Sequence, residues 1–359
     1  MAHVLERWFK KYFTDPEGVI LAVLLILGFA TVIVLGDMLT PVLASVVIAY
    51  LLEGIVGAAE RKGMPRLLAV GLVFSLFMAF LLFLVLGLAP LLSKQLAQLL
   101  QEIPAMVSQG QRMLSNLPES YPGFLNASQI SEVMANLRSA LTESGQQVLS
   151  FSIASISHLF TLLIYLVLLP VLVFFFMKDK FQLVEWFTRY LPKERGVSIR
   201  VWREMDRQIG NYVRGKFAEI LIVGIASYIA FSVMGLNYSP LLAALVGLSV
   251  VVPYIGAVVV TLPVLLIGFF QWGWGDTFAY LALAYFIIQA LDGNLLVPWL
   301  FSEAVNLHPI AIIVSILIFG GIWGFWGVFF AIPLATLVKA VLDAWPKVID
   351  DEPKLEPPI

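Results

Sequence analysis

Apolar runs long enough to cross a lipid bilayer recur along this chain. Four of them cover residues 19–35, 67–89, 159–177 and 220–236. A helix needs roughly 20 such residues to cross the hydrocarbon core. Charged residues make up only 13% of the 359 residues, against about 25% in a typical soluble domain. The sequence therefore predicts an all-α, polytopic membrane protein with about six full spans.

The positions of the basic residues predict how the spans are oriented. Most of the 22 lysines and arginines gather near the N-terminus, at 61–66, at 178–216 and from Lys339 onward, whereas residues 217–338 contain none. Cytoplasmic loops concentrate lysine and arginine. We therefore expect these clusters, and with them both termini, to face the cytoplasm of a bacterial inner membrane.

The N-terminal quarter is expected to be a scaffold of three spans. Residues 1–90 contain apolar stretches at about 18–36, 39–56 and 67–90. Gly36-Asp37 lies between the first two stretches, and glycine next to aspartate is typical of a turn. The sequence therefore predicts a tight turn there, and a third span that ends near residue 90.

Residues 91–149 differ from the spans because they are more polar and carry apolar side chains at helical spacing. We expect two amphipathic helices on the extracytoplasmic side. These helices would lie on the membrane, pack on a neighbouring subunit or pair with each other as a helical hairpin. A fourth span is expected at 150–177.

A basic segment follows at 178–216, with two helical patterns separated at Pro192. The second pattern combines an apolar stripe with arginines. The stripe consists of Ile199, Trp202, Ile209 and Tyr212. The arginines are Arg200, Arg203, Arg207 and Arg214. Such helices suit the anionic cytoplasmic leaflet. A soluble partner protein is the alternative, and nucleic acid is not expected as a partner because no recognition fold accompanies the charge.

The last third of the chain contains an internal repeat. The tetrad Asn237-Tyr-Ser-Pro240 recurs as Asn306-Leu-His-Pro309. Each tetrad opens an apolar stretch that is broken in its middle, at 253–256 in the first copy and at 320–324 in the second. An ordinary span precedes each copy. We therefore expect repeat 1 at 217–276 and repeat 2 at 277–345, followed by a cytoplasmic tail at 346–359.

The length of each broken stretch predicts how it folds. Residues 240–270 would measure about 46 Å as one helix, against a hydrocarbon core of about 30 Å, and they are too few for two crossings. A re-entrant helical hairpin with its tip at the break fits this length, and a single plain crossing is the alternative. We therefore expect two re-entrant hairpins arranged as an inverted repeat. Broken segments in corresponding positions of two halves are typical of a transport site.

Polar residues inside apolar spans are costly and therefore mark candidate sites. Asp292 is the strongest candidate, because it interrupts an apolar span and could carry a proton or sodium ion. The alternative is a carboxylate at the cytoplasmic boundary that caps the following segment. Other candidates for binding or gating lie beside it, at the breaks, in the tetrads and on the span before the first hairpin. They are Gln289, Asn294, Pro253, Tyr254, Gly256, Gly320, Gly321, Asn237, Asn306 and Glu219.

Structural roles are also expected for some of these candidates. Asn237 and Asn306 are expected to cap the first arm of each hairpin. Glu219 lies one helical turn from Lys216, and an ion pair between the two is favoured.

Several motifs resemble those of the autoinducer-2 exporter family, also called PerM-type permeases. They run in order over most of the chain: Glu60-Arg-Lys-Gly-Met-Pro-Arg66, Tyr212-Val-Arg-Gly-Lys216, Pro253-Tyr-Ile-Gly256, Asp292-Gly-Asn-Leu-Leu-Val-Pro298, Leu307-His-Pro309 and Ala331-Ile-Pro-Leu334. The chain departs from the family at Ala257, where a proline is usual, and at Asp292, where a glutamate is usual. The resemblance implies a secondary transporter in a homo-oligomer. Its cargo would be a small polar metabolite, such as a signalling furanone, or monovalent cations.

The sequence supports no enzyme class. It contains no HExxH motif, no nucleophile elbow and no P-loop, and it has no cysteine. No cofactor or metal is expected, and transport would draw on an ion gradient, with the site between the two hairpins. A sodium/proton antiporter is one alternative. Another is a membrane scaffold or regulator that acts through the basic helices, and a channel is a third.

The hairpin arrangement places the loop at 271–276 outside the cell, whereas a plain crossing places it in the cytoplasm. Because the chain lacks cysteine, a Gln271→Cys variant carries a single thiol. We expect an impermeant maleimide to label this thiol on intact cells. Labelling from the cytoplasmic side alone would contradict the inverted repeat.

Overall fold

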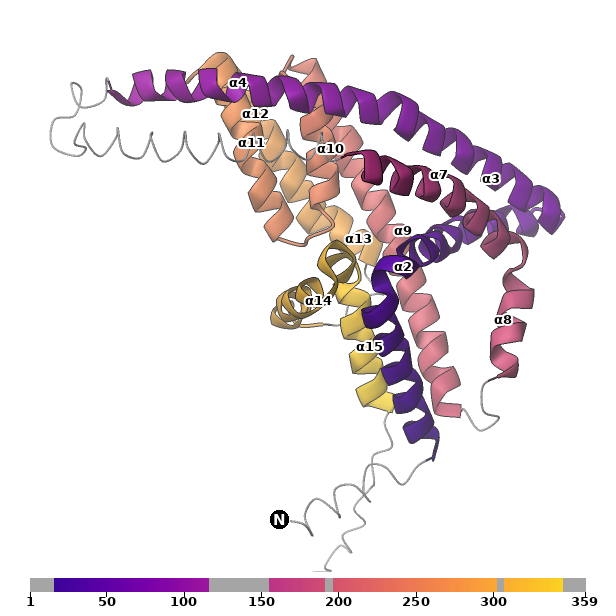
Figure 1. Cartoon of the computed structure of the whole chain (residues 1–359). Coiled ribbons are helices and arrows are strands. Elements are labelled where there is room, and N and C mark those ends of the chain that lie inside the picture. The colour runs from indigo at the N-terminus through magenta and orange to yellow at the C-terminus, as the bar shows by residue number, and fades with distance from the viewer. Residues whose placement is uncertain (1–15, 116–154, 191–195, 302–306, 345–359) are drawn as a thin grey trace, which may run out of the picture. The chain divides into compact units, whose positions relative to one another are not determined.

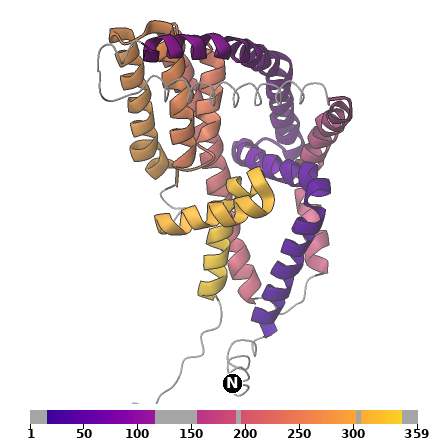
Figure 2. The ribbon, with the colours of Figure 1, turned by 60° about the vertical axis from the view of Figure 1, so that its left-hand side comes forward.

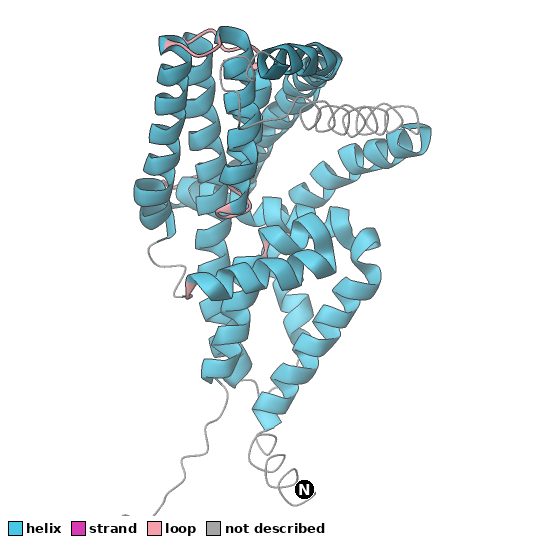
Figure 3. Ribbon diagram, turned by 90° about the vertical axis from the view of Figure 1, so that its left-hand side faces the viewer, coloured by secondary structure: helices cyan, strands magenta, loops and turns pink. Residues whose placement is uncertain are grey.

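The computed structural model describes residues 16–115, 155–190, 196–301 and 307–344, and every regular element in these ranges is helical (Figure 3). The chain forms two compact units. Unit 1 combines residues 1–51, 179–217 and 297–359, and unit 2 combines residues 52–178 and 218–296. Among the described residues, six helices are long and apolar enough to cross a membrane: Met38–Arg61, Arg66–Gly110, Val201–Val233, Ile255–Trp272, Asp276–Phe301 and Pro309–Phe329. The expectation of an all-α, polytopic protein is thus confirmed.

The first described helix, α2 (Pro16–Arg61), shows that the predicted turn at Gly36-Asp37 is wrong. Both residues are helical. Side-chain hydroxyls bond to backbone carbonyls one helical turn back here. Thr40 Oγ1 donates to the Gly36 carbonyl at 2.8 Å, and Ser45 Oγ donates to the Pro41 carbonyl at 2.6 Å. Hydrocarbon offers the backbone no other partners, so a helix continues through residues that would form a turn in water.

The helix that contains the third predicted span is also longer than expected. Helix α3 (Arg66–Leu82), the π-helical segment η1 (Phe83–Leu88) and helix α4 (Ala89–Ser115) form one continuous element. The helix therefore continues past residue 90 into the first expected amphipathic helix, and the point at which it leaves the membrane stays a prediction. The second amphipathic helix that we expected falls on residues 116–154, outside the described part of the chain.

Helix α4 belongs to unit 2, and Leu99 and Met106 on it pack against the core of this unit. Figures 1 and 2 show α4 running across the ends of α10 (Ser239–Ser249), α11 (Ile255–Trp272) and α12 (Asp276–Leu291). The Gln95 side chain accepts a hydrogen bond from Leu241 N at 3.0 Å, which satisfies one of the unpaired N–H groups that begin a helix. Burial, together with a hydrogen bond to Glu102, raises the pKa of Tyr238 to about 12. The Tyr238 hydroxyl therefore stays protonated beside α4.

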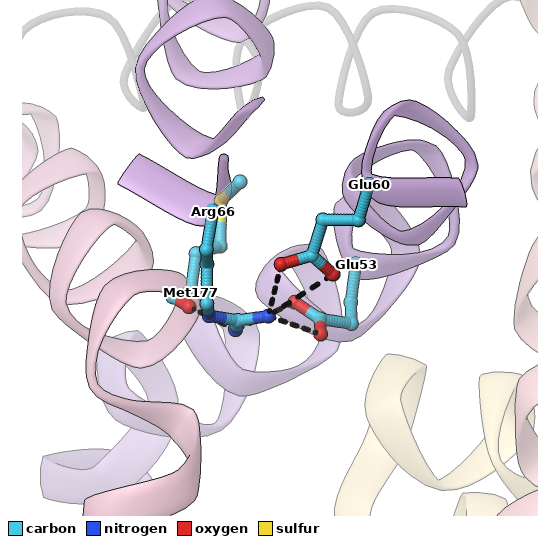
Figure 4. Close-up of polar contacts among 4 residues, drawn as sticks. All are labelled: Glu53, Glu60, Arg66 and Met177. Carbon is cyan, nitrogen blue, oxygen red and sulfur yellow. Dashed lines mark hydrogen bonds and ion pairs between the residues drawn. The ribbon is translucent and has the colours of Figure 1, made fainter. Parts of the chain in front are cut away.

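An arginine joins three helices of unit 2 (Figure 4). Arg66 Nη1 lies 3.3 Å from Glu53 Oε1 and 3.3 Å from Glu60 Oε1, and Arg66 Nη2 donates to the Met177 carbonyl at 2.7 Å. Met177 belongs to α7 (Ser155–Lys178), which is the predicted fourth span. Because Arg66 follows the short turn after α2, its planar fork fixes the ends of α2, α3 and α7 together.

The basic segment forms α8 (Lys180–Arg189) and the start of α9 (Gly196–Val233). Helix α9 continues without a break into the following span, so Lys216 and Glu219 lie one turn apart on the same helix. Its buried stripe differs in part from the predicted one: Val201 and Met205 are buried with Tyr212, whereas Trp202 is 72% exposed. Ile209 and Tyr212 of the predicted stripe face inward as expected, and Val201, Met205 and Ile209 pack against α2 and α15 (Ala331–Ala344).

Helices α10 and α11 form a hairpin whose tip, at residues 250–254, lies close to the predicted break. The two ends of the hairpin lie together, because the Gln271 side chain accepts from Asn237 N at 2.8 Å and donates to the Gly235 carbonyl at 2.8 Å. After the tip, Gly256 packs so closely that a Cβ atom added to it would overlap the Ser249 carbonyl. Only glycine fits this approach.

A second reversal occurs inside α14 (Pro309–Phe329), at Gly324, whose φ is 57°. After it, Gly327 packs so closely that an added Cβ atom would overlap the Phe319 carbonyl. The prediction placed Gly320 and Gly321 in the break, but both are helical and precede it. In the first tip, Tyr254 has a φ of 63°. Each hairpin tip thus has a residue with positive φ, followed by a glycine that touches the preceding arm.

We expect Gly256→Ala and Gly327→Ala to lower the stability of the purified protein by at least about 2 kcal/mol each, because the added methyl group must displace backbone. Gly321→Ala is the matched control, since no atom lies within 4 Å of its added Cβ. Thermal unfolding in detergent measures all three variants. Unfolding midpoints equal to that of the control would contradict the close approach.

Candidate functional site

A hydrogen-bonded chain of polar side chains connects α11 and α12 inside unit 2. Tyr285 is fully buried, and its hydroxyl lies 2.9 Å from Thr261 Oγ1. Gln289 Nε2 donates to the same hydroxyl at 3.0 Å, and the hydroxyl lies 3.3 Å from the Ala257 carbonyl. Buried polar groups in a span need such partners. The chain therefore holds the second arm of the first hairpin to α12.

Asp292 lies on the same face of α12 as Tyr285 and Gln289, at helical spacing. It begins the π-helical segment η2 (Asp292–Leu296) and is 8% exposed. The helix continues through η2 into α13 (Val297–Phe301), so no new helix begins at Asp292 for its carboxylate to cap. π-helical segments occur frequently at functional sites.

Several other candidate residues from the sequence do not lie beside Asp292 or do not have the role expected for them. Asn294 is exposed, and its amide donates to the Ala290 carbonyl at 2.9 Å. Asn237 does not cap α10, because Tyr238 occupies the cap position and no side chain caps the helix. Asn306 lies outside the described residues, and the side chain of His308 accepts from Ile310 N instead.

Helix α9 carries a buried acidic and a buried basic side chain. Glu219 is 2% exposed and Lys216 is 3% exposed. The Lys216 ammonium group lies 5.1 Å from the centroid of the Phe301 ring, a distance typical of a cation–π contact. The ion pair between Glu219 and Lys216 stays a prediction.

The tip of the first hairpin is strained. Tyr254 is exposed and has φ 63° and ψ −52°, while Ile255 N donates across it to the Pro253 carbonyl at 2.7 Å. This is the rare form of the three-residue γ-turn. Strained backbone at such a position is common at gates and ligand sites. The first tip belongs to unit 2 and the second, with Gly320 and Gly321, to unit 1.

Comparison with known proteins identifies the family. The family described as "AI-2E family transporter" matches residues 20–347. The chain belongs to this family. It is 47% identical to PerM of Escherichia coli over 346 residues, which cover 96% of this chain and 98% of PerM. It is also 26% identical to YueF of Bacillus subtilis over 335 residues, or 89% of this chain and 90% of YueF. The resemblance found from the motifs is confirmed, and the chain is a multi-pass bacterial membrane protein.

Three of the four arginines predicted for the membrane surface are described in this AI-2E family transporter, and all three are exposed. They are Arg203, Arg207 and Arg214. Arg207 pairs with Glu204 at 3.0 Å, and Arg214 donates to the Asn211 side chain at 3.1 Å. The side chain of Arg200 lies outside the described part. Contact of these arginines with lipid stays a prediction.

Sequence reasoning missed Tyr285 and Thr261, the centre of the hydrogen-bonded chain in this transporter. A signal was present, since Tyr285 and Gln289 lie one helical turn apart inside an apolar span. Within the described residues, no group of three or more histidine, aspartate or glutamate side chains is placed to hold a metal ion.

We expect Tyr285→Phe to destabilise this AI-2E family transporter by about 1–3 kcal/mol, because the change leaves the amide of Gln289 without its partner. Tyr280→Phe is the control, since Tyr280 is exposed on the same helix. Thermal unfolding in detergent compares the two variants. Equal unfolding midpoints would show that the hydrogen-bonded chain does not hold α11 to α12.

Proposed function

We propose that this protein is a secondary transporter of a small polar metabolite and that the charge state of Asp292 couples transport to an ion gradient. The observation that carries the proposal is the burial of Asp292 on the polar face of α12. A charged carboxylate inside a span is costly. A bound proton or monovalent cation neutralises it, so its occupancy can drive a change of conformation.

The hairpins support this proposal. Helix α10 has 11 residues and measures about 16 Å, too short to cross a core of about 30 Å. We infer that both hairpins are re-entrant and that the two copies have opposite orientations. In this arrangement each strained or glycine-lined tip reaches the membrane interior, where irregular backbone must line a cavity or be buried by protein.

The distribution of charge favours a cation or proton as the coupling ion. Residues 217–338 contain no lysine or arginine, so no fixed positive charge in this region repels a cation. The basic face of α9 is proposed to lie on the anionic cytoplasmic leaflet. The termini are proposed to be cytoplasmic, in an inner membrane, and the protein is proposed to form a homo-oligomer.

The test is an ion-flux and metabolite-counterflow screen in proteoliposomes. We expect Asp292→Asn to reduce gradient-driven flux at least tenfold, because an amide can neither bind nor release a proton. Asp292→Glu is expected to restore part of the flux. Asp276→Asn is the matched control, since Asp276 is exposed at the other end of α12 and its loss should leave flux unchanged.

Wild-type flux from Asp292→Asn would remove Asp292 from the mechanism. Absence of any flux from the wild-type protein, together with capture of a partner by the full chain that charge reversal of Arg203 and Arg207 abolishes, would favour the scaffold alternative instead.

A further inference from the structure

Ser227 has an unsatisfied hydroxyl in the interior of unit 2. It lies on α9, its exposure is 0%, and its Oγ atom has no hydrogen-bond partner among the described residues. Other hydroxyls in the helices bond to their own backbone: Ser249, Ser315 and Thr261 each donate to a carbonyl three or four residues earlier. An unsatisfied buried hydroxyl costs free energy, so a group that pairs with it is expected.

The neighbours of Ser227 follow from the packing of α9 against α12. Phe231, one turn after Ser227, stacks on Tyr285 with ring centroids 6.5 Å apart. The two helices run in opposite directions, because the contacts of Gln271 place the start of α12 beside the end of α9 (Figures 1 and 2). In this register we expect Ser227, one turn from the stack, to lie at about the level of Gln289. Asp292 follows about one turn further.

The side of α9 that faces α10 is closed. Gly224 and Gly247 bring the two backbones together, and a Cβ atom added to Gly247 would lie 2.9 Å from the Ile220 carbonyl. No molecule fits between these backbones. We therefore expect a partner for Ser227 on the side of α12, where Gln289 already uses its amide nitrogen on Tyr285 and can offer its carbonyl oxygen.

We propose that Ser227, Gln289 and Asp292 line a polar site between α9 and α12 that water enters when the transporter opens. The inference rests on the proposed function, because a transporter must open such a path. A buried water needs two to four polar partners, and these three side chains supply both donors and acceptors. Polar groups inside a span line water-filled cavities or the interior of a helix bundle. The site adds Ser227 to the transport path and gives Gln289 a second role.

The test uses the absence of cysteine from the chain. Ser227→Cys is nearly isosteric and places a single thiol at the site. In proteoliposomes without cargo, we expect a small cationic methanethiosulfonate to modify this thiol at least ten times faster than the thiol of Val223→Cys. Val223 is the matched control, since it is 1% exposed and lies one turn away on α9. Intact mass gives both rates.

Equal rates for the two variants would overturn the proposal, because a dry site excludes the reagent from both positions. This outcome is independent of flux. Rapid modification of Ser227→Cys in a preparation that shows no flux would support the hydrated site and contradict only the proposed transport function. If Ser227→Cys fails to fold, hydroxyl-radical footprinting of the wild-type protein replaces it. Oxidation of Tyr285, whose hydroxyl bonds to Gln289, well above that of the buried tyrosine Tyr212 is then expected, and equal oxidation overturns the site.

Discussion

The C-terminal half of the protein depends on close contact between backbones at two chain reversals. At each reversal a glycine, Gly256 or Gly327, touches a carbonyl of the arm that precedes it. Hydrocarbon cannot hydrate an exposed turn, so a reversal inside an apolar stretch must be compact and must satisfy its own polar groups. Glycine makes this possible because it brings no Cβ atom. The arms, the contacts of Gln271 and the position of α12 all follow from the first of these reversals.

The same constraint explains which parts of the fold could be predicted. The reversals were located to within a few residues because proline and glycine interrupt two equivalent apolar stretches. The turn at Gly36-Asp37 was wrong because the same turn signals carry less weight in hydrocarbon, where continuing the helix satisfies every backbone group. The sequence does not distinguish which of several nearby glycines turns the chain: Gly320 and Gly321 are helical, whereas Gly324, with φ 57°, makes the reversal.

Some residues of the candidate site could likewise be predicted from the sequence, and others could not. Asp292 could be chosen as a candidate from the sequence because carboxylates are rare in spans. Placing one there costs free energy, so its presence points to a function. Ser227, Thr261 and Tyr285 could not, since hydroxyls are common in apolar helices and usually bond to the carbonyl one turn back. Their importance depends on which neighbour each one faces. That depends on the register between α9, α11 and α12, which a single sequence does not contain.

The π-helical segment η2 connects these observations. Asp292 and Leu296 turn inward, whereas Gly293, Asn294 and Leu295 between them are exposed. The hydrogen-bonded chain fixes α12 up to Gln289, so a change in the charge of Asp292 acts on the segment directly beyond a fixed point. π-helical segments are less stable than α-helix and occur in single turns. A shift of η2 toward α-helix would rotate the residues that follow it. Under the proposed function, neutralising Asp292 would therefore move the chain beyond Leu296 without disturbing the first hairpin.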